Sequence, residues 1–230
     1  MAYLAEHGFT CQTVTELTTR TSTSSGNCSL KHVALTFDDA FADFTHAALP
    51  QLLRHEFSAT LYVPTAFVGR KASWLDAHGE GDRLVLSARE LVDLPANVER
   101  GSHGHTHRAL DLLPTDQARR DIVFSKQELE QMLGRSVHSF AYPYGFATRT
   151  TRRIVAEAGF RSGCAVRYRA AAPGDDAFYL PRIVVGPHTT TGDLAKLLQG
   201  AAAPGASHFE RWRSGVWRFG RASAALALNR

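Results

Sequence analysis

The stretch HVALTFDD at residues 32–39 joins an apolar run to two adjacent carboxylates. Residues 32–37 are mostly apolar and β-branched, which predicts a buried strand. Asp38 and Asp39 then fall where this strand ends and the chain turns towards a helix. In parallel sheets, ligand-binding and catalytic groups gather at the carboxyl ends of the strands. The stretch therefore predicts a parallel sheet with a candidate site at its edge, although a solvated turn or a helix cap would also explain two aspartates alone.

On either side of this stretch, short apolar runs alternate with amphipathic helical patterns. The alternation is typical of repeated β-α units, so the predicted class is α/β with a mostly parallel sheet. Further strands are predicted at 58–64, 98–102, 137–142, 159–166 and 179–185. Helices are predicted at 44–55, 87–94, 115–133, 148–158 and 190–198. Within the third helix, Thr115 is the expected N-cap and Gly134 ends the helix.

Composition limits the class of protein. The 230 residues, 44% of them hydrophobic, suffice for one compact domain. The net charge of +4 comes mainly from Arg-rich stretches in the second half, and no recognition motif accompanies it, so we exclude a nucleic-acid partner. Cys11, Cys28 and Cys164 have no regular spacing and are interpreted as isolated thiols.

The sequence also bears on the compartment. No apolar stretch approaches the roughly 20 residues that a membrane span requires. The first ten residues, MAYLAEHGFT, lack the layout of a signal peptide. As written, the chain is expected in the cytoplasm, and an extracytoplasmic location is the alternative if an export segment precedes this sequence.

A histidine cluster follows the predicted strand at 98–102. His103 and His107 lie four residues apart in GSHGHTH, which on a helical turn places both imidazoles on one face. With one carboxylate from 38–39 they supply three protein ligands, the number typical of catalytic zinc, which lowers the pKa of a bound water to about 7. The pattern indicates hydrolase chemistry.

The stretch FAYPYG at 140–145 is another strand end followed by a sharp turn. A backbone N–H in such a turn can donate to the oxyanion of a tetrahedral intermediate. Aromatic rings, here with Tyr142 and Pro143, can form one wall of a ligand groove. Pro-Tyr-Gly is also an ordinary turn, so this stretch alone decides nothing.

Together, TFDD at 36–39, SHGHTH at 102–107, FAYPYG at 140–145 and LPRI at 180–183 resemble the polysaccharide deacetylase family, also called the NodB-homology domain or carbohydrate esterase family 4. The resemblance implies a distorted (β/α) barrel of about seven parallel strands. It also implies a metal-dependent hydrolase that removes N-acetyl groups from an N-acetylated glycan. The expected organisation is an extension at 1–30 packed on the barrel, a deacetylase domain at 31–200 and a basic aromatic tail at 201–230.

Carried over position by position, the resemblance implies a role for each motif residue. Asp39, His103 and His107 would bind a divalent metal, Zn²⁺ foremost, with Co²⁺ or Ni²⁺ as alternatives. Asp38 would be the general base, and Tyr144 would offer its backbone N–H to the oxyanion.

The chain departs from the family pattern in three places. Ala40 stands where a glycine usually follows the paired aspartates, and Ala141 stands where many members carry an arginine that pairs with the base. We hypothesise that Arg182 replaces that arginine and keeps Asp38 ionised. The usual late histidine motif is not evident, and His188 is the best candidate for the general acid, with an exposed loop histidine as the alternative.

Two other functions stay open. The same metal and base would serve a hydrolase of a small cyclic amide or formamide. A glycan-binding pseudoenzyme would keep the groove without turnover, although the intact metal-binding pattern opposes it. Trp74 is expected to line the substrate groove, with a core or lid tryptophan as the alternative.

Overall fold

The computed structural model describes residues 1–23, 31–172 and 174–199 of the chain. Two parallel sheets lie within them. A two-stranded sheet pairs β1 (Thr10–Gln12) with β2 (His32–Ala34). A six-stranded sheet follows the chain order, with the strands β3 (Thr36–Phe37), β4 (Ala59–Val63), β5 (Val98–Ser102), β6 (Ser139–Ala141), β7 (Ser162–Val166) and β8 (Leu180–Arg182).

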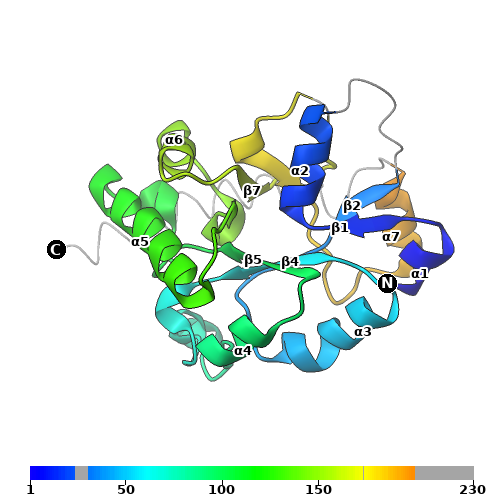
Figure 1. The fold of residues 1–230 in the computed structure, drawn as a ribbon, viewed down its shortest axis with the longest axis horizontal. Coiled ribbons are helices and arrows are strands. Elements are labelled where there is room, and N and C mark those ends of the chain that lie inside the picture. Colours follow the sequence, from blue (N-terminus) through cyan, green and yellow to red (C-terminus); the bar gives the residue numbers. More distant parts are fainter. Residues whose placement is uncertain (24–30, 173, 200–230) are drawn as a thin grey trace.

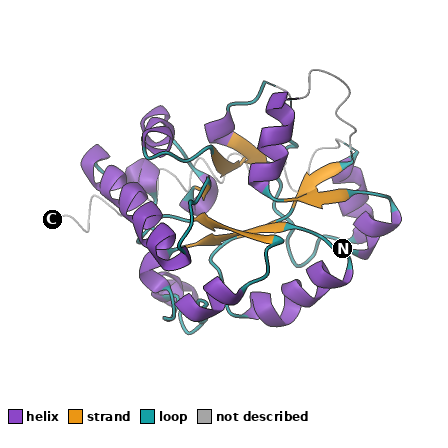
Figure 2. Ribbon diagram, in the orientation of Figure 1, coloured by secondary structure: helices purple, strands orange, loops and turns teal. Residues whose placement is uncertain are grey.

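Helices connect the strands and cover the sheet. They are α1 (Ala2–Glu6), α2 (Val14–Thr23), α3 (Leu49–Arg54), which continues a π-helical turn at Phe44–Ala48, α4 (Ala88–Asp93), α5 (Thr115–Leu133), α6 (Arg149–Glu157) and α7 (Thr191–Leu198). Helices α3 to α6 lie around the outside of the curved sheet (Figures 1 and 2), so the sheet curls into a half-barrel with β3 and β8 as its two edges. The α/β class is confirmed, with six strands in this sheet. None of the helices in the described ranges is long and apolar enough to span a bilayer.

The run at 32–37 that was predicted as one strand is two strands. β2 pairs with β1 in the small sheet, whereas β3 pairs with β4 through Thr36 and Thr60 in the large one. Leu35 is the residue between them, and its carbonyl accepts a hydrogen bond from the Thr60 N–H at 2.9 Å. The prediction of one continuous strand is wrong because the chain passes from one sheet to the other at Leu35.

The start of α2 closes the end of the half-barrel where β4 and β5 begin. Val14 is 3% exposed, and its N–H donates to Thr60 Oγ1 at 2.9 Å. The Thr15 N–H and Thr60 Oγ1 both donate to Glu99 Oε2, at 3.2 and 2.7 Å. Val14 packs with a small cluster formed by Tyr62, Ala141 and Cys164. The start of α2 is thus tied to the sheet.

Two of the three cysteines and the longest helix lie within the described residues. Cys11 and Cys164 are free and buried, while Cys28 and the tail at 201–230 lie outside the described residues. Helix α5 spans the predicted residues, but its N-cap is Pro114 and not Thr115. Gly134 ends the helix in the left-handed conformation, with φ of 64°, and its N–H donates to the Glu130 carbonyl.

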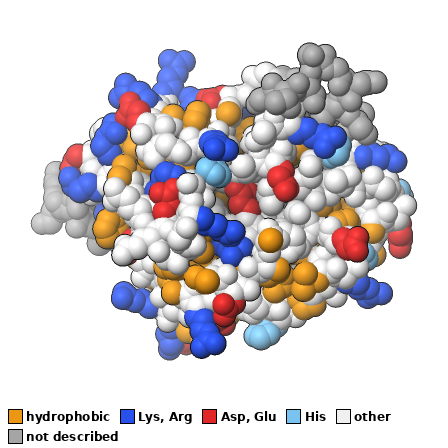
Figure 3. Space-filling model, viewed as in Figure 1, with side chains coloured by type: hydrophobic (Ala, Val, Ile, Leu, Met, Phe, Trp, Pro, Cys, Tyr) orange, Lys and Arg blue, Asp and Glu red, His pale blue; other side chains and the backbone are white. Residues whose placement is uncertain are grey.

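Lys and Arg side chains gather over α5 and α6 (Figure 3). Most of these arginines have an acidic partner, as in Arg119–Glu157 and Arg152–Asp176, each at 2.7 Å. Pairs at the surface contribute little to stability, on the order of 0–1 kcal/mol. Most basic side chains of α5 and α6 are therefore paired with nearby carboxylates.

Gly101, on β5, lies close to side-chain and backbone atoms of the two neighbouring strands, β4 and β6. A Cβ at Gly101 would lie 2.5 Å from the Tyr62 ring and 2.9 Å from the Ser139 carbonyl oxygen. The ring cannot move away easily, because the Tyr62 hydroxyl lies 2.6 Å from Ser139 Oγ. We expect Gly101→Ala to lower the free energy of unfolding by about 1–3 kcal/mol through overpacking, measured by urea denaturation.

Gly192, in α7, is the matched control because a Cβ there meets nothing closer than 3.8 Å. Gly192→Ala should raise the free energy of unfolding by about 0.4–1 kcal/mol through restriction of the unfolded chain. Equal stability of Gly101→Ala and the wild type would contradict the close packing.

Candidate active site

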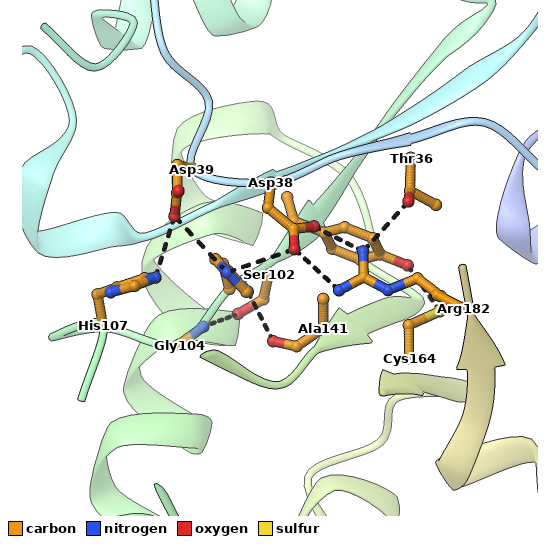
Figure 4. A network of polar contacts seen from close by, with 11 residues as sticks. Thr36, Asp38, Asp39, Ser102, Gly104, His107, Ala141, Cys164 and Arg182 are labelled. Carbon is orange, nitrogen blue, oxygen red and sulfur yellow. Dashed lines mark hydrogen bonds and ion pairs between the residues drawn. The ribbon is translucent and has the colours of Figure 1, made fainter. Parts of the chain in front are cut away.

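The functional side chains follow or end three separate strands of the six-stranded sheet and meet at one end of the half-barrel (Figure 4). Asp38 and Asp39 follow β3, His103 and His107 follow β5, and Arg182 is the last residue of β8. Because all pairings in the sheet are parallel, the carboxyl ends of its strands all lie at the same end of the half-barrel. The structure therefore brings together the residues that the sequence analysis grouped from separate motifs.

Arg182 and Asp38 form two parallel hydrogen bonds. Arg182 Nη1 donates to Asp38 Oδ1 at 2.7 Å, and Nη2 donates to Oδ2 at 2.8 Å. Nη1 also donates to Thr36 Oγ1 at 3.1 Å. Since β3 and β8 are the two edge strands, the guanidinium joins them where no backbone ladder does. The contribution of Thr36 was not predicted, although it belongs to the same TFDD stretch.

Two opposing effects set the ionisation of Asp38. Burial raises the pKa of its carboxyl, but the Arg182 guanidinium, together with His103 and His107, outweighs burial and lowers the pKa to about 2. For Arg182, burial lowers the pKa, and the Asp38 carboxylate more than offsets this and raises it. Asp38 is consequently an ionised carboxylate at neutral pH, which is the state required of a proton acceptor.

Asp39, His103 and His107 form a cluster whose potential ligand atoms all lie within 4.8 Å of one another. Asp39 Oδ1 is 3.0 Å from His107 Nε2 and 3.6 Å from His103 Nε2. His103 Nδ1 lies 2.8 Å from the Ala141 carbonyl oxygen, so the proton sits on Nδ1 and the Nε2 lone pair faces the cluster. Burial lowers the pKa of His103, which favours this neutral form.

This donor set fits a divalent metal. Two imidazole nitrogens and one carboxylate oxygen are the ligand types of catalytic zinc. Their spacing of 3.0–3.6 Å around Asp39 Oδ1 suits ligands that each bind a common ion at about 2.0–2.2 Å. A cation between them would satisfy lone pairs that otherwise face one another.

The turn after β3 carries the paired aspartates in an unusual conformation. Asp39 has φ of 71° and Ala40 has φ of 50°, both in the left-handed region. This conformation costs a residue with a side chain roughly 1–2 kcal/mol. It explains why glycine suits the position after the aspartates, whereas Ala40 here is fully buried in the core.

Aromatic rings form one wall beside the cluster. The Trp74 ring centroid lies 4.6 Å from that of His107 and 4.5 Å from that of Phe67. On another side, the ring of Tyr144 lies 5.1 Å from that of His107 and is 43% exposed. Trp74 thus lies beside His107, a candidate metal ligand, and not in a core away from the site.

Two residues that were predicted to bind substrate are buried, and the predicted general acid lies in an exposed turn. The Tyr142 side chain is fully buried, and its hydroxyl donates to the Phe178 carbonyl at 2.7 Å, so it presents no surface to a ligand. Pro143 is also buried, in the turn that carries Tyr144. His188 is exposed in the turn after β8, and within the described residues no hydrogen bond or ion pair joins it to the cluster.

The contact between Arg182 and Asp38 can be tested without turnover. In Arg182→Ala, the pKa of Asp38 should rise from about 2, because burial would no longer be opposed by the guanidinium. Carboxyl NMR titration of metal-free protein should show Asp38 taking up its proton at higher pH in the variant. Arg169→Ala removes the partner of Asp175 in a part-buried pair that has no contact with Asp38, and is the control that should leave Asp38 unchanged. An unchanged Asp38 titration in Arg182→Ala would contradict this account.

Comparison with known proteins places these features in a family. The family model for polysaccharide deacetylases matches residues 25–163, more than half of the chain. The poly-beta-1,6-N-acetyl-D-glucosamine N-deacetylase of Staphylococcus aureus is 23% identical over 170 residues, covering 70% of this chain and 56% of that protein. The chain thus spans little more than half the length of that relative.

Solved structures share the fold. The structure of IcaB from Ammonifex degensii is 25% identical, with a TM-score of 0.74 and 86% of each chain covered. The Streptococcus pyogenes deacetylase PplD in complex with acetate is 23% identical, with a TM-score of 0.73, covering 86% of this chain and 83% of that one. These likenesses show the shared fold, and the match of the family model over residues 25–163 shows that the chain belongs to the polysaccharide deacetylase family.

Proposed function

We propose that this protein removes N-acetyl groups from an N-acetylated glycan, with a divalent metal bound by Asp39, His103 and His107 and with Asp38 as the general base. The observation that carries the proposal is the placement of an ionised Asp38 beside the Asp39–His103–His107 cluster. His103 Nε2 lies 3.9 Å from Asp38 Oδ2 and 3.6 Å from Asp39 Oδ1, so base and ligand set face the same space.

The chemistry divides between the two aspartates. A bound divalent metal would polarise the acetyl carbonyl and lower the pKa of water. Asp38 would accept the proton of the attacking water, since Arg182 keeps its carboxylate ionised. Arg182 also fixes both oxygens of Asp38, so the base is oriented as well as charged.

The turn after β6 would stabilise the negative charge that develops on the carbonyl oxygen. Tyr144 adopts φ of 62°, which turns its peptide relative to the flanking residues of the sharp turn at Pro143–Gly145. We assign its backbone N–H as the oxyanion donor. Trp74, packed against His107, would form the wall of the sugar groove.

The substrate class comes from the relatives. The Staphylococcus aureus protein is named as a deacetylase of poly-beta-1,6-N-acetyl-D-glucosamine. We therefore propose a polymer or oligomer of N-acetylglucosamine as the substrate, with Zn²⁺ as the metal and Co²⁺ or Ni²⁺ as substitutes.

Acetate release from N-acetylglucosamine oligomers tests the proposal. Metal-stripped protein should be inactive and should regain activity with Zn²⁺ or Co²⁺. Asp38→Asn should lower turnover by roughly 10²–10⁴-fold, the usual contribution of a general base, while zinc still binds. His103→Ala should lose both zinc binding and activity.

The outcomes separate the alternatives. Binding of one equivalent of zinc without release of acetate would contradict the proposed deacetylation of a glycan. A panel of small cyclic amides and formamides would then distinguish a hydrolase of another amide from a glycan-binding protein without turnover.

We further propose His188 as the donor of a proton to the departing amine, an assignment that rests on its place in the loop after β8, the strand that ends at Arg182. His188→Ala should lower turnover by about 10²-fold or more and alter the alkaline limb of the pH–rate profile. His78→Ala is the control, because His78 is another exposed histidine. Unchanged turnover in His188→Ala would remove it from the mechanism.

A further inference from the structure

The loop that carries the two histidine ligands has a constrained backbone. Gly104 has φ of 77° and His107 has φ of 52°, so the loop at 103–107 turns through the left-handed region twice. Positive φ is uncommon for a residue other than glycine, and it persists where the surrounding structure holds it. The separation of His103 and His107 therefore depends on whatever holds this loop.

Asp121, on α5, contacts the loop through both of its carboxylate oxygens. Its Oδ1 accepts a hydrogen bond from the His105 N–H at 2.7 Å. Its Oδ2 accepts from the Thr106 N–H at 3.0 Å and from Thr106 Oγ1 at 2.5 Å. The three donors all lie between the two histidine ligands, and Asp121 is only 7% exposed.

The approach of Asp121 to the loop is close. A Cβ at Gly104, whose φ is 77°, would lie 2.8 Å from Asp121 Oδ1, so a side chain at this position would force the carboxylate to move. On the opposite side, the loop is fixed by backbone hydrogen bonds from the Thr65 N–H to the Gly104 carbonyl at 3.1 Å and from the Ala66 N–H to the His105 carbonyl at 3.0 Å. The loop is thus held between α5 and the chain that leaves β4.

The polar contacts continue along one face of α5. Ser125 and Glu128 follow Asp121 by four and seven residues, which places all three on the same side of the helix. Ser125 Oγ lies 2.7 Å from Ser102 Oγ, and Glu128 Oε2 lies 2.9 Å from His105 Nδ1. Asp121 differs from these two because it alone binds the backbone between the ligands.

We infer that Asp121 is a positioning residue that holds the loop at 103–107 in the conformation that binds the metal. The inference rests on the proposed metal site and adds a residue to it that touches neither metal nor substrate. An asparagine has nearly the same shape, but its NH₂ group would face a loop N–H in place of one acceptor oxygen. That loss should release the loop and separate the two imidazoles.

The test measures zinc affinity in the metal-free protein by competition with a chromophoric chelator. Asp121→Asn should weaken zinc binding by about 10–100-fold, the usual effect of removing a residue that orients metal ligands. Thr106→Val, which removes one of the three donors, should weaken it by a smaller factor and serves if Asp121→Asn fails to fold.

Two controls separate positioning from general stability. Asp116→Asn changes an exposed carboxylate on the same helix, and Ile122→Val removes one buried methyl group beside Asp121. Both variants should retain the zinc affinity of the wild type. Ile122→Val should do so although its metal-free form has a lower melting temperature.

The outcomes distinguish this inference from the proposed function. Wild-type protein that binds no zinc would overturn the metal site and this inference together. Wild-type protein that binds zinc, with equal affinity in Asp121→Asn and Thr106→Val, would overturn the positioning role alone. Weakening of similar size in Ile122→Val would also overturn it, because stability would then explain the effect.

Discussion

The pair of hydrogen bonds between Arg182 and Asp38 is the interaction on which the site depends most. The six-stranded sheet is open, and its edge strands β3 and β8 share no backbone ladder. The Arg182 side chain, 12% exposed, spans this opening and contacts both Thr36 and Asp38. Arg182 therefore joins the two edge strands and also fixes the carboxylate of Asp38. Among the described residues, Arg182 is the cation that pairs with both oxygens of the part-buried Asp38 carboxylate.

The neighbouring aspartates illustrate how one dipeptide can supply two different groups. Adjacent carboxylates repel each other, and here the backbone directs them to different partners (Figure 4). Asp38 faces the guanidinium of Arg182, while Asp39, in the left-handed conformation, faces His103 and His107. The conformational cost of the turn is thus linked to the separation of the proposed base, Asp38, from the proposed metal ligand, Asp39.

Much of the architecture could be predicted from local sequence. The periodicity at 115–133 predicted α5 with its bounds, because apolar spacing and the final Gly134 are local signals. The break at Leu35 could not be predicted, since the apolar run at 32–37 continues through it and only pairing with β1 and β4 divides it. Burial of the Tyr142 side chain depends in the same way on a tertiary contact, with the Phe178 carbonyl.

For the site, the motifs predicted which residues would lie together, and the structure adds how they are held. Paired carboxylates and histidines at strand ends are recognisable because catalytic metal sites use few residue types. Asp121 was not recognisable, because an aspartate in an amphipathic helix usually indicates a solvent-facing position. Only the packing of α5 against the loop at 103–107 reveals its three hydrogen bonds.

The position of Arg182 on the last strand of the sheet has a consequence for the order in which the protein is made. Asp38 and Arg182 are 144 residues apart in the chain. Synthesis proceeds from the N-terminus at about 5–20 residues per second, and parallel pairings over such distances form slowly. Asp38 therefore leaves the ribosome many seconds before its guanidinium partner exists. The nascent chain can assemble most of its strands while the site is still incomplete, and the active centre is finished only when β8 docks.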